Sequence, residues 1–167
     1  MDGIANLFIR RPGIRPCASS ITIGSHIDSQ PNGVRLDGVY GVAVGLELLQ
    51  TLDEANIGTE HPVDVAIWTN EEGCRFSPGA MGSAFFTGSE SLDHLVNRSD
   101  AHGILLEQAL AAAFAAFADA PIREYDHAIA AYLEPHIEQG PVLETNVIPI
   151  GIVTGIQGVR WCDVEIE

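Results

Sequence analysis

The stretch from Ile21 to Leu49 constrains the fold of this chain more than any other segment. It begins with the β-branched run Ile21-Thr22-Ile23, which is typical of a buried strand. A loop rich in Gly, Pro and Asn follows, and the stretch ends in apolar residues that suit a helix packed on a sheet. A strand, a polar loop and a helix in this order predict an α/β fold that presents polar side chains at the carboxyl end of a strand.

Three predicted strands, near residues 21–25, 63–68 and 128–137, run into imidazole or carboxylate side chains. These side chains are His26, Asp28, Asp37, Glu71, Glu72, His136 and Glu138. Because imidazole and carboxylate groups are ligands that Zn²⁺, Mn²⁺ and Co²⁺ accept, the three strand ends predict a metal site. The alternative interpretation is a loop histidine, aspartates that cap turns and a solvated acidic loop.

Within this pattern the residues suggest different roles. Asp28 follows His26 by two positions and is placed to accept the second ring N–H, which would fix the tautomer of the histidine. Asp37 has two oxygens and could bridge a metal pair. Glu71 and Glu72 would repel each other if both stayed unpaired, so one is expected to bind metal while the other acts as a base near a bound water.

Composition narrows the class of protein. The chain has 167 residues, 46% of them apolar, so it can bury a core within one domain or within part of a larger one. The net charge of −15 argues against nucleic acid and anionic membranes as partners. Three cysteines without CxxC spacing favour a reducing cytoplasm. We see neither the apolar core of a signal peptide nor a run that could span a membrane.

Further elements are expected from local patterns. These are strands at 3–10, 147–153 and 161–167, helices at about 39–56, 91–97 and 103–117, a short helix within 77–88, and one helical turn at 141–144.

Four segments carry a more specific signal: GSHIDSQPNGVRLDGVYGVAVGLE, TNEEGCRF, YLEPHIEQGP and GIVTGIQG. In this order they closely resemble the amidohydrolase family of N-carbamoyl-L-amino-acid hydrolases, β-ureidopropionases and allantoate amidohydrolases, within the metallo-aminopeptidase/aminoacylase superfamily. The resemblance implies a zinc-aminopeptidase-like catalytic domain with a mixed sheet flanked by helices, here truncated at both ends. It also implies two divalent metal ions, with Zn²⁺ expected and Mn²⁺, Co²⁺ or Ni²⁺ as alternatives.

The resemblance assigns a role to each matching residue. His26 matches a ligand of the first metal, Asp37 the bridging carboxylate, and His136 the remaining protein ligand of the first metal. Glu72 matches a ligand of the second metal. Glu71 matches the general base, which would deprotonate the attacking water and return the proton to the leaving nitrogen.

Other implications concern substrate and domain organisation. Gln139 lies where the family's HIEQG motif faces substrate, so a substrate contact is expected there. Residues 1–159 would form a partial catalytic domain, and 160–167 would begin the first strand of a lid that also makes the family's homodimer. Pro135, directly before His136, removes one strand N–H, which is a departure from the family pattern.

Three functions compete at this point. The first is a metal-dependent hydrolase of non-peptide C–N bonds acting on a small N-carbamoyl, ureidopropionate or allantoate-type substrate. The second is an inactive remnant that at most binds metal, because the resemblance places the last histidine of the second metal site outside this chain. The third is a dipeptidase or aminoacylase of the same superfamily, which the HIEQGP segment disfavours.

Overall fold

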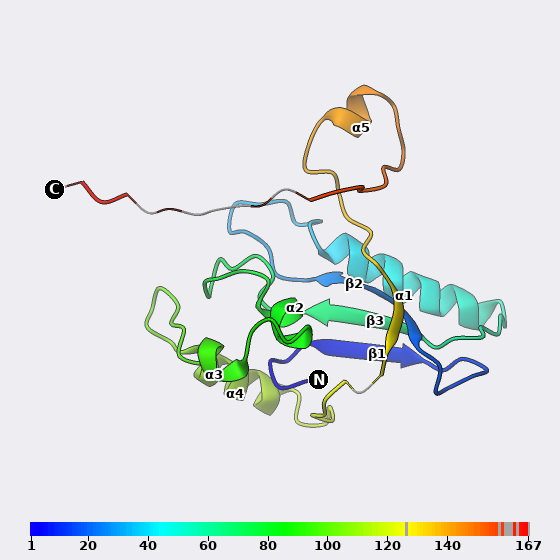
Figure 1. Cartoon of the computed structure of the whole chain (residues 1–167), viewed down its shortest axis with the longest axis horizontal. Helices are drawn as coiled ribbons and strands as arrows, with labels where there is room; N and C mark the ends of the chain where they lie inside the picture. Colours follow the sequence, from blue (N-terminus) through cyan, green and yellow to red (C-terminus); the bar gives the residue numbers. More distant parts are fainter. Residues whose placement is uncertain (126, 157, 159–161, 163, 167) are drawn as a thin grey trace. The chain divides into compact units, whose positions relative to one another are not determined.

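The computed structural model describes residues 1–125, 127–156, 158, 162 and 164–166. The chain divides into two compact units, Met1–Ile137 and Glu138–Glu167. In chain order the elements are β1 (Leu7–Arg11), β2 (Ser20–His26), α1 (Val39–Glu54), β3 (Val63–Trp68), α2 (Met81–Phe86), α3 (Leu92–Leu95), α4 (Leu106–Ala116), β4 (Ile129–Leu133) and α5 (Val142–Thr145) (Figure 1).

A four-stranded mixed sheet in the order β1-β3-β2-β4 organises the first unit. Strand β2 pairs in parallel with β3 and β4, whereas β1 is antiparallel to β3. The carboxyl ends of β2, β3 and β4 therefore meet at one edge of the sheet, as the sequence pattern predicts. This arrangement confirms the expected α/β fold with a mixed sheet and flanking helices.

Helix α1 packs on β2 and β3 (Figure 1). Its buried residues are Gly41, Val42 and Gly45. A second apolar cluster joins the start of the chain to the three short helices α2, α3 and α4; its buried members are Ile4, Phe76, Met81, Leu95, Leu106 and Leu110. The strand ends that carry polar residues are thus supported by two packed groups of side chains.

A buried charge ties the edge strand to the sheet. Asp64 of β3 is fully buried and accepts two hydrogen bonds from Arg10 of β1, at 2.8 and 2.7 Å. The hydroxyl of Tyr125 donates to the same carboxylate and lies 2.9 Å from the hydroxyl of Ser20. Burial raises the pKa of Asp64, but the hydrogen bonds from Arg10, Tyr125 and Ser20 outweigh it and leave that pKa below its usual range.

Most predicted elements are present, but the prediction of a strand at 147–153 is wrong. Val147 has a φ of 55°, and the N–H groups of Val147 and Ile148 donate back to the carbonyls of Glu144 and Leu143. These residues therefore form the turn that ends α5 rather than the start of a strand. Pro149 lacks a backbone donor, and no residue of 147–153 pairs with a described strand.

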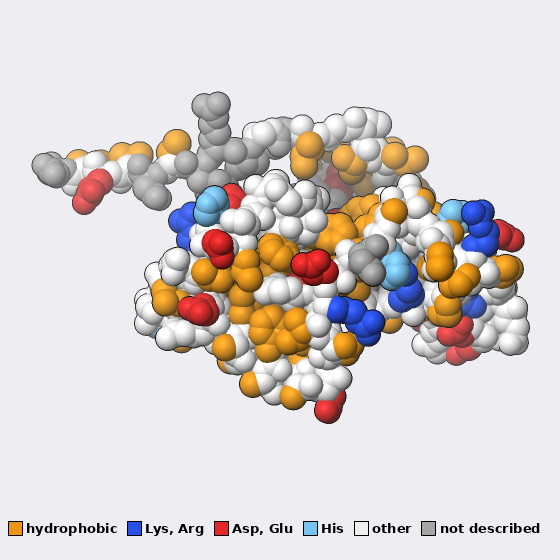
Figure 2. Space-filling view, turned by 60° about the horizontal axis from the view of Figure 1, so that its bottom comes forward, with side chains coloured by type: hydrophobic (Ala, Val, Ile, Leu, Met, Phe, Trp, Pro, Cys, Tyr) orange, Lys and Arg blue, Asp and Glu red, His pale blue; other side chains and the backbone are white. Residues whose placement is uncertain are grey.

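The predicted lid strand cannot be compared with the structure in the same way. Residues 160, 161, 163 and 167 lie outside the described residues, so the boundary at 159/160 stays a prediction. Among the residues that the structure describes, no helix is long and apolar enough to cross a membrane. Figure 2 shows apolar side chains exposed in several groups on one face, interleaved with acidic and a few basic residues.

Candidate metal centre

Three potential ligands converge at the carboxyl edge of the sheet. His26 ends β2, Asp37 lies just before α1, and His136 follows β4 by three residues. One ligand atom from each lies within 4.8 Å of those of the other two. His26 and Asp37 are buried, whereas 32% of the His136 side chain is exposed. Residues far apart in the sequence are thus brought close enough together to bind one metal ion.

Both histidines are oriented by backbone carbonyls. Nδ1 of His26 lies 2.9 Å from the carbonyl oxygen of Asp28, and Nδ1 of His136 lies 2.8 Å from that of Ile137. Because a carbonyl oxygen can only accept, each Nδ1 carries the hydrogen, which leaves Nε2 as the ligand atom.

The contact between His136 and Asp37 tests the fit of a cation. Nε2 of His136 lies 2.9 Å from Oδ1 of Asp37. With the hydrogen of the neutral ring on Nδ1, both of these atoms are acceptors. Such a short approach requires either a second proton on the imidazole or a shared cation, so this donor set suits a divalent metal.

Gly38 allows His26 to lie close to the start of α1. Its φ is 42°, and a Cβ atom at this position would lie 2.5 Å from three atoms of the His26 ring. A glycine is therefore required next to Asp37, because any side chain would displace the imidazole.

Asp28 orients His26 differently from the prediction. The carbonyl oxygen makes the closer contact with the ring, whereas the carboxylate lies 3.4 Å from Nδ1. The carboxylate instead accepts hydrogen bonds from the backbone N–H groups of Glu71 and Glu72, at 3.2 and 3.0 Å. Asp28 thus joins the loop after β2 to the loop after β3. Burial raises the pKa of Asp28, but the hydrogen bonds from His26, Glu72 and Glu71 together lower it by more, so that the net shift is downward.

The charges around His26 favour a cation. Burial lowers the pKa of His26, but the hydrogen bonds and charge of Asp28, together with the charge of Glu71, raise it to about 9. The acidic surroundings of His26 thus favour a positive charge at this position, which a divalent metal bound at Nε2 would supply.

Glu71 lies in surroundings that raise the pKa of its carboxyl group. Burial raises its pKa, and although the charge of His26 lowers it, the neighbouring acids Glu134, Asp28 and Glu72 add to the increase. A raised pKa makes a carboxylate a stronger base, as the predicted role of Glu71 requires.

Glu72 lies outside the three-residue group but has a free ligand atom. Its Oε2 accepts a hydrogen bond from Gln30 at 3.0 Å. Its Oε1 is the one buried side-chain oxygen without a hydrogen-bond partner among the residues that the structure describes. An unsatisfied buried carboxylate oxygen is costly unless a cation occupies the adjacent space, which fits the role of a metal ligand. Gln139 belongs to the second unit, which is described by itself, and its substrate contact stays a prediction.

The sequence pattern did not single out Glu134. This residue lies two positions before His136, and its carboxylate accepts hydrogen bonds from Ser25 at 2.8 Å and from Tyr132 at 3.0 Å. The period of two in a strand could have found it, since residues 132, 134 and 136 would share one face of an extended segment.

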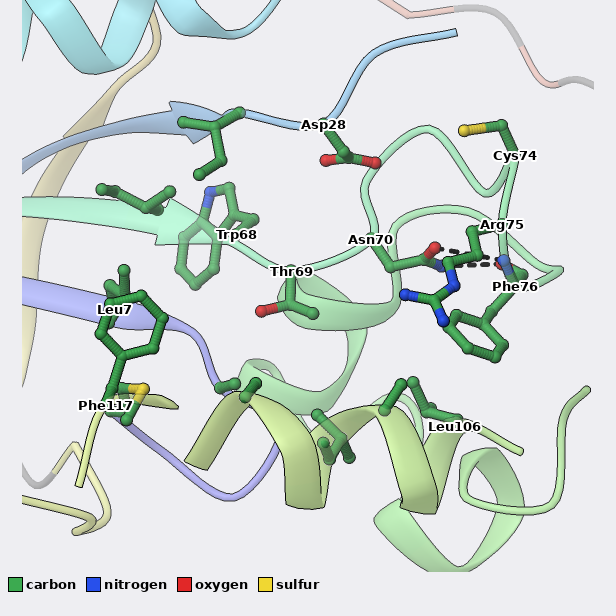
Figure 3. Close-up of a pocket in the computed structure, with 17 residues that line it drawn as sticks. Leu7, Asp28, Trp68, Thr69, Asn70, Cys74, Arg75, Phe76, Leu106 and Phe117 are labelled. Atoms are coloured by element: carbon green, nitrogen blue, oxygen red, sulfur yellow. Dashed lines mark hydrogen bonds between the residues drawn. The ribbon is translucent and has the colours of Figure 1, made fainter. Parts of the chain in front are cut away.

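Two cavities lie near the site. One, of 350 Å³, is mostly apolar and lies between the ends of β1 and β3 and helix α4; Figure 3 shows Asp28 at its upper rim and Leu106 and Phe117 below. The other, of 320 Å³, is lined by Glu71 and Glu134 together with Trp68, Phe86 and Tyr132. The second cavity is therefore the one that adjoins the candidate base.

Known proteins with similar sequences indicate the family of this chain. Residues 22–167 match the model of peptidase family M20/M25/M40. The chain is 40% identical over 163 residues to an N-carbamoyl-L-amino-acid amidohydrolase of Rhizobium meliloti, covering 98% of this chain and 38% of the relative. It is 31% identical over 172 residues to a ureidoglycolate hydrolase of Arabidopsis thaliana, covering 99% of this chain and 36% of the relative.

A solved structure extends the likeness to three dimensions. A hydantoinase/carbamoylase family amidase from Burkholderia ambifaria superposes with a TM-score of 0.79 and 49% identity, over 87% of this chain and 35% of the amidase. The chain thus spans little more than a third of the length of these relatives. Together with the mixed sheet, these matches agree with the resemblance drawn from the sequence: this chain belongs to peptidase family M20/M25/M40, and it is similar to amidases of the hydantoinase/carbamoylase family.

Proposed function

We propose that this chain carries the first metal-binding site and the general base of a metal-dependent amidohydrolase that cleaves non-peptide C–N bonds. The expected substrates are small molecules with a linear amide or ureido group, of the N-carbamoyl-amino-acid, ureidopropionate or allantoate type. The single observation that carries the proposal is the approach of His26, Asp37 and His136 to within 4.8 Å, next to a glutamate of raised pKa.

Each residue has a role in this proposal. His26, Asp37 and His136 would hold the first ion, and Asp37 with Glu72 would hold the second. When bound, a divalent cation lowers the pKa of water and polarises the C=O group under attack. Zn²⁺ is the expected ion because the set combines imidazole and carboxylate groups, and Mn²⁺, Co²⁺ and Ni²⁺ are alternatives.

Glu71 would move the proton. Its raised pKa lets it take a proton from the attacking water and return it to the leaving nitrogen. Asp28 would keep Glu71 in place, because its carboxylate binds the backbone of that residue and its carbonyl binds His26. Gln139 would contact the substrate.

The cysteines and the net charge also bear on the location of the protein and on its binding partners. We expect a cytoplasmic location, since the three cysteines are unpaired and exposed. The net charge of −15 makes nucleic acid and anionic membranes unfavourable partners. A homodimer, formed through a lid domain, is expected for full-length members of this family.

The test replaces the base without touching a ligand. Glu71→Gln removes the proton acceptor but keeps the shape of the side chain, so hydrolysis of N-carbamoyl amino acids should fall by at least about 10²-fold while zinc affinity is retained. Glu47→Gln, on the exposed part of α1, is the matched control and should keep both.

The assay also separates the competing functions. It compares N-carbamoyl amino acids, ureidopropionate, allantoate and dipeptides as substrates of the zinc-loaded chain. Turnover of dipeptides alone would favour the dipeptidase. Zinc binding without turnover of any substrate would favour the inactive remnant, and full activity of Glu71→Gln would exclude Glu71 as the base.

A further inference from the structure

The segment that carries His136 is not held by the sheet. The ladder between β2 and β4 runs from Ser20↔Ile129 to Ile23↔Leu133. His136 lies three residues beyond that last pair, and Pro135 has no N–H to extend the ladder. A metal ligand must nevertheless be held within about 0.5 Å of its working position. Some other contact therefore has to fix His136 relative to His26.

The side chain of Glu134 makes a contact of this kind. Its Oε1 accepts a hydrogen bond of 2.8 Å from the hydroxyl of Ser25, which directly precedes His26 in β2. Ser25 is fully buried. One hydrogen bond thus joins the residue before the first histidine to the residue two before the second.

The second oxygen of Glu134 extends this contact to a third strand. Oε2 accepts from the hydroxyl of Tyr132 at 3.0 Å, and that hydroxyl accepts from the indole N–H of Trp68 at 2.7 Å. Trp68 ends β3 and leads into the loop of Glu71. The chain of bonds Trp68–Tyr132–Glu134–Ser25 therefore links the carboxyl ends of the three strands that present the candidate site.

The other side of the segment is fixed by α1. A Cβ atom at Gly41 would lie 2.5 Å from the carbonyl oxygen of Pro135 and 2.8 Å from Cβ of Ser25. The segment 134–136 thus lies against the start of α1, where Asp37 also lies, and the carboxylate of Glu134 holds it laterally.

We propose that Glu134 is a positioning residue of the metal centre: by accepting the hydrogen bond of Ser25, it holds His136 in line with His26 and Asp37. The inference rests on the proposed function, since it concerns the same site. It adds a residue that is not itself one of the candidate metal ligands and that acts through Ser25.

The test measures zinc affinity by competition with a chromophoric chelator at pH 7.5. Glu134→Ala and Ser25→Ala should each weaken zinc binding by about tenfold, the low end of the range for groups that support metal ligands. The double variant should bind zinc as tightly as Glu134→Ala does, because both substitutions remove the same hydrogen bond. Glu134→Gln keeps an oxygen that can accept from Ser25 and should bind within about twofold of the wild type.

A matched control separates this contact from a general loss of charge or stability. In α1, the hydroxyl of Thr51 lies 3.4 Å from Oε1 of Glu47, which is the same kind of pair far from the site. Glu47→Ala removes the same charge and should leave zinc affinity unchanged. Urea unfolding of each metal-free variant shows which variants are folded. Ser25→Ala removes the hydrogen bond to Glu134 while the carboxylate of Glu134 remains.

The outcomes are distinct. Wild-type zinc affinity in folded Glu134→Ala and Ser25→Ala would overturn the inference while leaving the proposed function intact. Equal losses in Glu134→Gln and Glu134→Ala would also overturn it, since the charge and not the bond would then matter. A wild-type chain that binds no zinc would contradict the proposed function itself, and the inference with it.

Discussion

Gly38 shows how a single residue without a side chain controls the candidate site. Its φ of 42° lies in the left-handed region, and the His26 ring occupies the space that a Cβ would need. The residues 26, 37 and 136 could be predicted from the sequence because each follows a recognisable strand or precedes a recognisable helix. The contact between Ser25 and Glu134 could not, since it depends on how β2 and β4 pair and on the conformations of two side chains.

Gly38→Ala tests this close contact. The substitution should weaken zinc binding, because the Cβ displaces the His26 ring, and should lower the free energy of unfolding by about 1–3 kcal/mol because of backbone strain. Gly88→Ala is the matched control: Gly88 has a φ of 73° but nothing within 4 Å of its Cβ position. The variant Gly88→Ala should have a lower free energy of unfolding than the wild type but the same zinc affinity. Equal zinc affinity in both variants would show that the His26 ring does not depend on Gly38.

Helices and strands match their predicted bounds where local sequence signals define them, and the expected strand without a pairing partner does not form. The strand Val63–Trp68 matches its predicted bounds, and α1 starts at Val39 as predicted, because continuous apolar runs and turn residues define them locally. The expected strand at 147–153 has the same β-branched composition but pairs with no described strand. Composition alone therefore does not make a strand, because the ladder supplies its hydrogen bonds.

The pairing of β1 with β3 should depend on pH through Asp64. The folded pKa of this buried carboxyl is depressed, so its contribution to stability is present above the unfolded pKa of about 3.9 and is lost as the pH falls through the folded value. Urea unfolding between pH 2.5 and 7 should therefore show a fall in stability below about pH 4.

Asp64→Asn is the matched variant for this prediction. It should lower the free energy of unfolding by about 3 kcal/mol at pH 7, because Arg10 loses its partner, and should flatten the acid dependence. The same acid dependence in Asp64→Asn and in the wild type would assign the effect to other carboxyl groups.

For the whole molecule, composition predicted a core but not its extent. Residues 1–137 bury two groups of apolar side chains, whereas no residue of 138–156 is buried. In that second unit Val147, Ile152 and Val153 are each at least 85% exposed. A count of apolar residues cannot distinguish a segment with a buried core from one with exposed apolar side chains, because burial depends on neighbouring elements rather than on composition. The candidate site lies in the unit that has a core.

A zinc titration tests most directly whether His26, Asp37 and His136 form one metal site. Isothermal titration would be made on the wild type, on His136→Ala and on His94→Ala, an exposed histidine of α3 whose side chain is 77% exposed. We predict a zinc site in the wild type and in His94→Ala, with affinity at least about tenfold weaker in His136→Ala. The same zinc affinity in His136→Ala as in His94→Ala, or no zinc binding by the wild type, would show that these three residues do not form a zinc site.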